Sequence, residues 1–284
     1  MKPRQLLRRI NAIQRIVKIT RAMEVVASTR LRKLELKFIP VKEYCNILED
    51  IVRQIYISYH NLPNFWFRPR SDGNILIVVI GSDRGLCGAF NFELLAKVKE
   101  LIQQLEAGNK KVIDIIPVGK KCTSYCRRIY EKEGLINYSG KEKEIAKILK
   151  DKITTSYREE KVDNVVIIST QYKKSGREKI KVERVLPIKF EDLQQKERNV
   201  DWILEPDWES LLDLIVPVFL EYRLLYTLME SRLAEELSRM LAMKYAKENG
   251  EEMINNLTLK YHRARQAQIT TEILEITQGV EAVL

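Results

Sequence analysis

The sequence predicts an α/β protein with two long helices. An antiparallel coiled coil of N- and C-terminal helices is expected beside a small central α/β domain of Rossmann-like type. Glycine is absent before Gly73, and nine of the eleven glycines fall between Gly73 and Gly176. Apolar residues recur at helical spacing in both terminal segments, and strand-like runs alternate with helix-like runs between them. We expect residues 1–60 to form the N-terminal coiled-coil helix, 61–207 the central α/β domain and foot, and 208–284 the C-terminal coiled-coil helix.

The N-terminal segment has the pattern of one side of a coiled coil. Its apolar seam, with polar interruptions, runs through Leu6, Ile10, Ile13, Val17, Thr20, Glu24, Ala27, Leu31 and Leu34. These positions repeat at steps of three and four, which is the spacing of a helix face that packs on another helix. Pro40 is expected to kink or end this helix, and a second helical stretch should then run from Val41 to about Tyr59.

The middle of the chain alternates between strand and helix patterns. Strands are predicted at residues 74–82, 111–118, 162–171 and 180–190, and helices at 91–105, 120–132 and 141–158. Such alternation is typical of a largely parallel sheet, here with an antiparallel strand added at one edge.

The C-terminal segment is expected to be one very long helix. Beyond Glu209 the only proline is Pro217, and apolar residues keep helical spacing. If the roughly 70 residues after Leu211 are helical, a rise of ~1.5 Å per residue gives a rod of order 100 Å. The last turns carry a narrow apolar stripe of Ile269, Ile273, Ile276, Val280 and Val283. Antiparallel pairing with the N-terminal helix is the economical arrangement.

Composition limits the possible functions. A 45% apolar chain of 284 residues can build a core, and a net charge of +10 predicts acidic partners. Nucleic acid, anionic lipid and an acidic protein surface fit that charge equally well. The longest clean apolar run, Ile75 to Ile80, is too short to cross a membrane, and the first residues do not resemble a secretory signal. We expect a reducing, cytosolic-side location.

The sequence contains no recognisable catalytic or metal-binding set. The two histidines, His60 and His262, have no clustered cysteine or carboxylate, and of the four cysteines only Cys122 and Cys126 are close together. These two share a helix face, and buried thiols are a better interpretation than a redox pair. We therefore expect no metal, no cofactor and no catalysis by this chain alone.

A glycine-containing turn follows the first predicted strand, from Gly81 to Asn91. Such a turn before a helix could hold a phosphate at the helix N-terminus. Its spacing matches neither the dinucleotide-binding fingerprint nor the P-loop pattern, so a structural turn is the preferred interpretation.

Three segments together resemble the γ subunit family of F-type ATP synthases. The first runs from Arg8 to Lys33 and includes Lys18-Ile19-Thr20-Arg21-Ala22-Met23-Glu24. The second is Ser82-Asp83-Arg84-Gly85-Leu86-Cys87-Gly88 with Asn91, and the third joins residues 239–249 to Tyr261 through Val283. They occur in family order and span the chain, so together they are highly specific.

The resemblance implies a rotating central shaft that couples ion flow to nucleotide chemistry on other subunits. Family members stand inside a ring of three alpha and three beta subunits, one copy per complex, and their α/β domain meets the epsilon subunit and the membrane c ring. Catalysis belongs to the beta subunits. The location implied is peripheral, on the cytoplasmic face of the cell membrane.

The resemblance also assigns contact residues. Residues 1–37 hold eleven Lys or Arg against two acids. The basic helix and Met23 would face an acidic loop of the beta subunit through Arg8, Arg9, Lys18, Arg21, Met23, Arg30, Arg32 and Lys33. A second beta contact, with a catch loop, would involve Arg265, Gln266, Thr270 and Glu272. Trp202 and Glu205 match the foot that rests on the c ring. Ile276, Val280 and Val283 match the tip held in a bearing, with packing against the partner helix as an equal interpretation.

Three other functions are alternatives to that of a rotating shaft. A basic coiled-coil protein that binds nucleic acid would need base-stacking aromatics or a recognised module, and the first helix has neither. A nucleotide-dependent enzyme would need a complete phosphate loop. The central shaft of V-type or A-type motors is disfavoured by the Ser82 to Asn91 motif and the α/β domain.

Overall fold

The computed structural model describes residues 3–58, 64–68, 70, 73–108, 110–134, 138, 140–173, 179–190 and 207–281. Two helices dominate it, α1 (Pro3–Ser58) and α5 (Trp208–Glu281). Contacts divide the chain into two compact units, one of Arg30–Ser238 and one of Met1–Thr29 with Arg239–Leu284. Both long helices contribute to both units, so each unit is described separately below.

The smaller unit is a pair of antiparallel helices. The Nζ of Lys247 lies 2.9 Å from Oε2 of Glu24, and a Cβ on Gly250 would lie only 2.5 Å from Cγ2 of Val17. Going from Glu24 back to Val17 on α1, the contacting residue on α5 advances from Lys247 to Gly250. The two helices therefore run antiparallel, as predicted. Every seam residue from Leu6 to Ala27 is buried or half-buried.

The larger unit contains a four-stranded mixed sheet with the order β2-β1-β3-β4. Strand β1 (Asn74–Ile80) pairs in parallel with both β2 (Lys111–Val118) and β3 (Asn164–Gln171). Strand β4 (Lys179–Leu186) joins β3 in antiparallel fashion at the edge. The predicted parallel sheet with an antiparallel addition is therefore confirmed.

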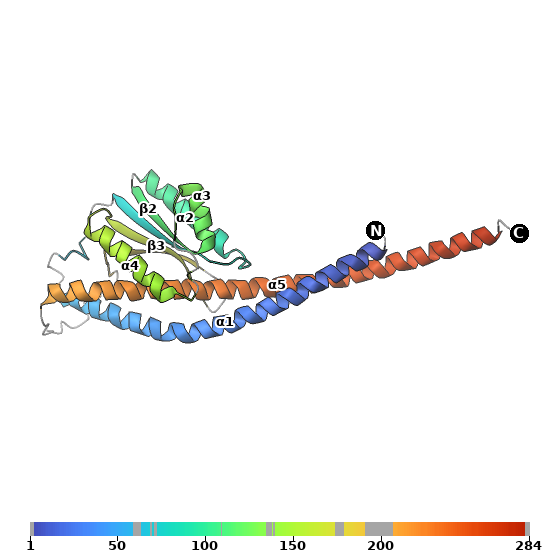
Figure 1. Ribbon diagram of the computed structural model, residues 1–284, viewed down its shortest axis with the longest axis horizontal. Helices are drawn as coiled ribbons and strands as arrows, with labels where there is room; N and C mark the ends of the chain where they lie inside the picture. Colours follow the sequence, from blue (N-terminus) through green and yellow to red (C-terminus); the bar gives the residue numbers. More distant parts are fainter. Residues whose placement is uncertain are drawn as a thin grey trace. The chain divides into compact units, whose positions relative to one another are not determined.

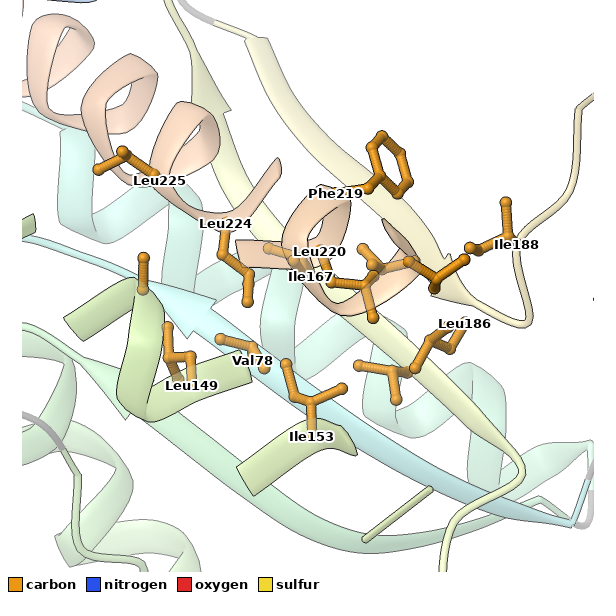
Figure 2. Close-up of a cluster of buried hydrophobic side chains, with 14 of the residues drawn as sticks. Val78, Leu149, Ile153, Ile167, Leu186, Ile188, Phe219, Leu220, Leu224 and Leu225 are labelled. Carbon is orange, nitrogen blue, oxygen red and sulfur yellow. The ribbon is translucent and has the colours of Figure 1, made fainter. Parts of the chain in front are cut away.

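Helices cover both faces of this sheet (Figure 1). Ile75, Ile77 and Val79 pack under α2 (Phe90–Ala107) and α3 (Lys120–Tyr130). The alternate residues of β1 face α4 (Glu142–Arg158) and the first part of α5. Figure 2 shows this second core, in which Val78 lies among side chains of α4, β3, β4 and α5. Because β1 is buried on both faces, its sequence is an unbroken apolar run.

Two sequence-based boundaries need correction. Helix α1 does not end at Pro40 but continues through it to Ser58. Phe38 and Val41, on either side of the proline, pack against the same core, and this packing holds the helix together. The last strand was predicted at 180–190 but ends at Leu186, because Pro187 has no N–H to donate to the ladder.

Candidate functional site

The predicted basic contact residues lie on α1, where most of them face solvent. Arg8, Arg9, Lys18, Arg21, Arg32 and Lys33 are exposed, and Met23 and Arg30 are half-buried. Nη1 of Arg30 lies 3.9 Å from Oε1 of Glu236, whose side chain is 3% exposed. Within the described residues the other six cations form no ion pair, so their charge is available to a partner.

The second predicted contact set lies near the end of α5. Arg265, Gln266, Thr270 and Glu272 are all exposed. Oγ1 of Thr270 donates to the carbonyl of Gln266 over 3.0 Å, and Nε2 of Gln268 donates to Oε1 of Glu272 over 2.7 Å. Gln266 and Thr270 are four residues apart and therefore neighbours on the helix surface. All four side chains are thus exposed on α5, with Gln266 and Thr270 side by side on the helix surface.

The end of α5 has no partner helix opposite it. With Val17 opposite Gly250, equal rise along two antiparallel helices places residue 265 opposite about residue 2. Ile269, Ile273 and Ile276 are accordingly 43%, 55% and 67% exposed. Ile276 is the most exposed of the three, and nothing in the described part of α1 covers it. The side chain of Val280, and Val283, lie outside the described residues.

The predicted foot residues, Trp202 and Glu205, also lie outside the described residues. The chain is held firmly just after them. Oδ2 of Asp207 accepts a hydrogen bond from the backbone N–H of Ser210 over 3.0 Å at the start of α5. One turn later, Oδ1 of Asp213 accepts from Nε1 of the fully buried Trp66 over 3.0 Å.

The loop after β1 is closed by its own hydrogen bonds. Oδ1 of Asn91 accepts from the backbone N–H of Ser82 over 3.2 Å, and Nδ2 of Asn91 donates to Oγ of Ser82 over 2.7 Å. Oγ of Ser82 donates to the carbonyl of Arg84 over 2.7 Å. Leu86 and Gly88 have positive φ angles of 62° and 57°, which this tight path requires. The Ser82 hydroxyl and the Asn91 side-chain amide are therefore already used within the loop.

The neighbouring strand ends strengthen this closure. Gly119, after β2, has a φ of +98°, and a Cβ there would lie 2.7 Å from the carbonyl oxygen of Gly81. The hydroxyl of the fully buried Tyr138 donates to that same carbonyl over 3.0 Å. Burial raises the pKa of Tyr138 well above its ordinary value, so the phenol stays a neutral donor.

Helix α5 occupies the crevice in which α/β domains usually bind ligands. In open sheets that crevice lies at the carboxyl ends of the strands where the strand order reverses, which here is between β1 and β3. Oγ of Ser231 donates to the carbonyl of Ile80 over 3.4 Å, and Oγ of Ser238 donates to the carbonyl of Cys87 over 2.8 Å. Ala234 packs with Cys87 and Phe90 between them. Structural use of the loop, the preferred interpretation, agrees with this geometry.

Sequence reasoning missed these residues of α5. Their signal was present, since Ser231, Ala234 and Ser238 are small and spaced three and four apart. A stripe of small residues on a helix face indicates close approach of another backbone.

The two neighbouring cysteines behave as core residues. Cys122 and Cys126 of α3 are both fully buried against the sheet. A hydrogen bond between the thiols raises the pKa of Cys122, and burial adds to the rise, while the same bond lowers the pKa of Cys126. Among the residues the structure describes, no cluster of three or more His, Cys, Asp or Glu side chains could hold a metal ion. No described helix is both long enough and apolar enough to span a bilayer.

Comparison with known sequences finds full-length relatives. A family model described as ATP synthase matches residues 2–283. The chain is 30% identical over 282 residues to the ATP synthase gamma chain of Chlorobaculum tepidum, covering 97% of this chain and 96% of the relative. It is 31% identical over 287 residues to the ATP synthase gamma chain of Leptospira biflexa serovar Patoc, covering 99% of each.

Comparison with solved structures finds the same fold. A chain from the central stalk and c-ring structure of the Tetrahymena thermophila mitochondrial ATP synthase matches with a TM-score of 0.63 at 21% identity, covering 80% of this chain and 99% of that one. A chain from the Euglena gracilis mitochondrial ATP synthase matches with a TM-score of 0.56 at 17% identity, covering 92% and 95%.

Proposed function

This chain belongs to the ATP synthase gamma chain family, and from that premise we propose that it is the central rotor shaft of the F1 sector of an F-type ATP synthase. Its partners are three alpha and three beta subunits, an epsilon subunit and the c ring, with one copy of the chain in each complex. Rotation of the shaft couples ion flow through the c ring to ATP synthesis or hydrolysis on the beta subunits.

One structural observation supports the shaft role above all others. Helix α5 continues beyond its pairing with α1, and this last part exposes polar residues such as Arg265 and Gln266 beside apolar residues such as Ile273 and Ile276. A helix end with this surface is costly in water and useful inside a ring of other subunits. A nucleic-acid-binding protein would gain nothing from an exposed apolar helix end.

The chain is proposed to have no catalytic role of its own. The crevice of its α/β domain is filled by Ser231, Ala234 and Ser238 of α5. Nucleotide chemistry would then take place on the beta subunits, and the shaft would act by favouring different beta conformations as it turns.

The exposed cations of α1 are proposed to face an acidic loop of the beta subunit. Arg8, Arg9, Lys18, Arg32 and Lys33 have no competing ion pair among the described residues. Each such exposed contact contributes only about 0–1 kcal/mol. Weak contacts of this kind suit a surface that must release one beta subunit and meet the next. Arg30 contributes less, because Glu236 already lies beside it.

The second beta contact is proposed for Arg265, Gln266, Thr270 and Glu272, which are exposed on α5 and can hydrogen-bond to a catch loop. Ile276, Val280 and Val283 would sit in the bearing at the top of the ring. Trp202 and Glu205 would rest on the polar loops of the c ring. The chain would thereby be a peripheral membrane protein on the cytoplasmic face of the cell membrane.

The test is assembly with the alpha and beta subunits of the same genome. Co-expression followed by size exclusion should give one copy of this chain with three alpha and three beta subunits, and ATP hydrolysis should depend on its presence. A chain that elutes alone while alpha and beta stay unassembled would limit the relationship to fold. In that case salt-dependent binding to DNA would test the nucleic-acid alternative.

A further inference from the structure

We propose that Ser231, Ala234 and Ser238 of α5 form a torque joint, a socket that fixes the rotational position of the helix on the α/β domain. This inference rests on the proposed function, because torque from the c ring would enter the chain through the α/β domain and leave it through the helices. The three residues are positioning residues, since they touch no nucleotide.

The polar part of the joint holds the helix to the end of β1 and the loop that follows it. Ser231 is fully buried and donates to Ile80, the last residue of β1. Ser238 donates to Cys87 over 2.8 Å. The two hydroxyls are seven residues, or about two helical turns, apart, so they mark one line along α5. A hydrogen bond weakens steeply when its angle changes, so these two contacts resist rotation of the helix about its own axis.

The apolar part of the joint depends on a small side chain. Ala234 is fully buried against Cys87 and Phe90, and Tyr172, just after β3, packs on the same cluster. The loop after β1 therefore packs on α5 at Ala234, and the residue that follows β3 packs on the same cluster. A larger side chain there would have to displace one of them.

Two further contacts extend this grip to the neighbouring helices. The hydroxyl of Tyr172 donates to Oε1 of Glu35 on α1 over 2.5 Å. Nη1 of Arg232 lies 2.9 Å from Oε1 of Glu142 on α4, and both side chains are 14% exposed. The carboxyl end of β1 is thus hydrogen-bonded to α5, and Tyr172, just after β3, joins the sheet to α1.

The remainder of the contact between α5 and the sheet is mainly apolar. Leu220, Leu224 and Leu228 pack on the sheet through apolar side chains. Apolar burial is non-directional and tolerates small rotations. The joint adds directional contacts at the end of β1 and in the loop after it, while the ion pair between Arg223 and Glu183 holds α5 to β4 at the edge of the sheet.

The first experiment measures coupling in the complete enzyme in membrane vesicles. Ala234→Leu and the double variant Ser231→Ala/Ser238→Ala should lower the ATP-driven pumping of the coupling ion, proton or sodium, per ATP hydrolysed to less than half of the wild-type ratio. ATP hydrolysis by the isolated complex with alpha and beta subunits should stay near wild type, which separates a loose joint from a misfolded shaft. Ser124→Ala, an exposed serine on α3, is the matched control and should leave the ratio unchanged.

An unchanged pumping ratio in both assembled variants would overturn the joint while leaving the shaft function intact. Loss of chain-dependent hydrolysis in the wild type would instead be a failure of the proposed function. Should Ala234→Leu fail to assemble, the double variant, which only removes two hydroxyls, decides the matter.

A second measurement reads the joint directly. Hydrogen exchange by mass spectrometry of the complex should show faster exchange in residues 82–90 for Ser238→Ala, by about fivefold for one lost hydrogen bond of ordinary strength. Exchange in β2, on the far side of β1, should not change. Equal acceleration in both segments would mean global loosening and would contradict a local joint.

Discussion

At the scale of single residues, Arg223 of α5 forms ion pairs with two other elements of the larger unit, α1 and β4. Its guanidinium Nη1 lies 3.0 Å from Oε2 of Glu49 on α1, and the same group donates to Glu183 on β4. Burial opposes ionisation of Glu183, yet Arg223 and Lys181 hold the pKa of this carboxyl below its ordinary value. One half-buried cation therefore joins both long helices to the sheet.

Replacing this cation should destabilise the larger unit. Arg223→Met leaves the half-buried carboxylates of Glu49 and Glu183 without this partner, and a hydrogen bond to a charged group contributes about 1.5–3 kcal/mol. Urea denaturation of the isolated chain measures the change. Lys97→Met, which breaks the exposed pair with Glu100, is the control and should cost at most about 1 kcal/mol. Equal losses in the free energy of unfolding for the two substitutions would show that the ion pairs of Arg223 contribute no more than one exposed pair.

The cost of Arg223→Met should also depend on pH. A carboxyl whose pKa is lowered by folding contributes stability above its ordinary pKa, here 4.5, and that stability is lost as pH falls through the lowered value. In the variant, Lys181 alone opposes the effect of burial on Glu183, so the pKa of this carboxyl is higher and the folded protein binds a proton more readily. The stability gap between variant and wild type should therefore be smaller at pH 4 than at pH 7. A gap that does not change with pH would assign the effect of Arg223 to packing.

Whether the role of a residue could be predicted depends on how far away in the sequence its partners lie. The seam from Leu6 to Ala27 was predictable, because a repeat of three and four is written locally. The exposed state of Arg8 and Lys18 followed from their positions off that seam. The ion pairs of Arg223 could not be predicted, since Glu183 and Glu49 lie on other elements and many carboxylates compete for the same partner.

At the scale of elements, α1 shows how packing overrides a helix breaker. Proline in a helix interior removes a hydrogen bond to the residue four positions earlier, here Leu36, and its ring crowds that carbonyl. Cys45 and Leu48, in the following turns, are buried in the larger unit. The packed turns on both sides keep the helix continuous.

Removing the proline should therefore stabilise the chain. Pro40→Ala restores the missing donor on an exposed face, and we expect the free energy of unfolding to rise by up to about 3 kcal/mol. Thermal denaturation followed by circular dichroism measures this. Lys37→Ala, exposed on the same helix, should change stability by less than about 0.5 kcal/mol. A fall in stability on removing Pro40 would mean that the core needs the bend that proline imposes.

In the smaller unit, Gly250 sets how closely the helices approach. Gly250→Ala improves helix propensity by about 1 kcal/mol but places a methyl group against Val17, and overpacking costs about 1–3 kcal/mol. We expect a net loss of stability in the wild-type background and a net gain in the Val17→Ala background. A double-mutant cycle by urea denaturation measures this coupling. Additive effects would show that the two residues do not touch.

The elements themselves were largely predictable, and their arrangement only partly so. Strict alternation of β-rich and helical runs predicted the sheet and the antiparallel edge strand. The crossing of α5 over the ends of β1 and β3 could not be predicted, because the loop from Gly81 to Asn91 has the glycine content of a ligand-binding turn. The hydrogen bonds of Ser231 to Ile80 and of Ser238 to Cys87 join residues more than 140 positions apart in the sequence.

At the scale of the whole molecule, the end of α5 should matter for the complex and not for the free chain. A chain that stops after Gln268 loses only residues that are exposed in the described part of this segment. Its free energy of unfolding should therefore change by less than about 0.5 kcal/mol. Coupled activity of the assembled enzyme should fall, because the proposed bearing contact is gone. Thr277→Ala, exposed in the same segment, is the control, and normal coupling in the truncated enzyme would sink the bearing assignment.

The two long helices could be predicted from the sequence, but the residue at which their pairing ends could not. Periodicity predicted two long helices and their antiparallel order. How far α5 continues alone depends on the register between the helices, which close packing of Gly250 on Val17 fixes. A period of three and four is the same in every register, so the pattern could not reveal it.

The uncovered end of α5 also affects how the enzyme can be built. Ile269, Ile273, Leu274 and Ile276 are all more than 40% exposed in the isolated chain, and a row of such residues invites self-association. A newly made copy that has not met its ring is therefore an aggregation hazard. The cell must supply alpha and beta subunits together with the shaft, or shield the helix with a chaperone until they arrive. Surplus shaft should be found with chaperones and proteases and not as a stable free pool.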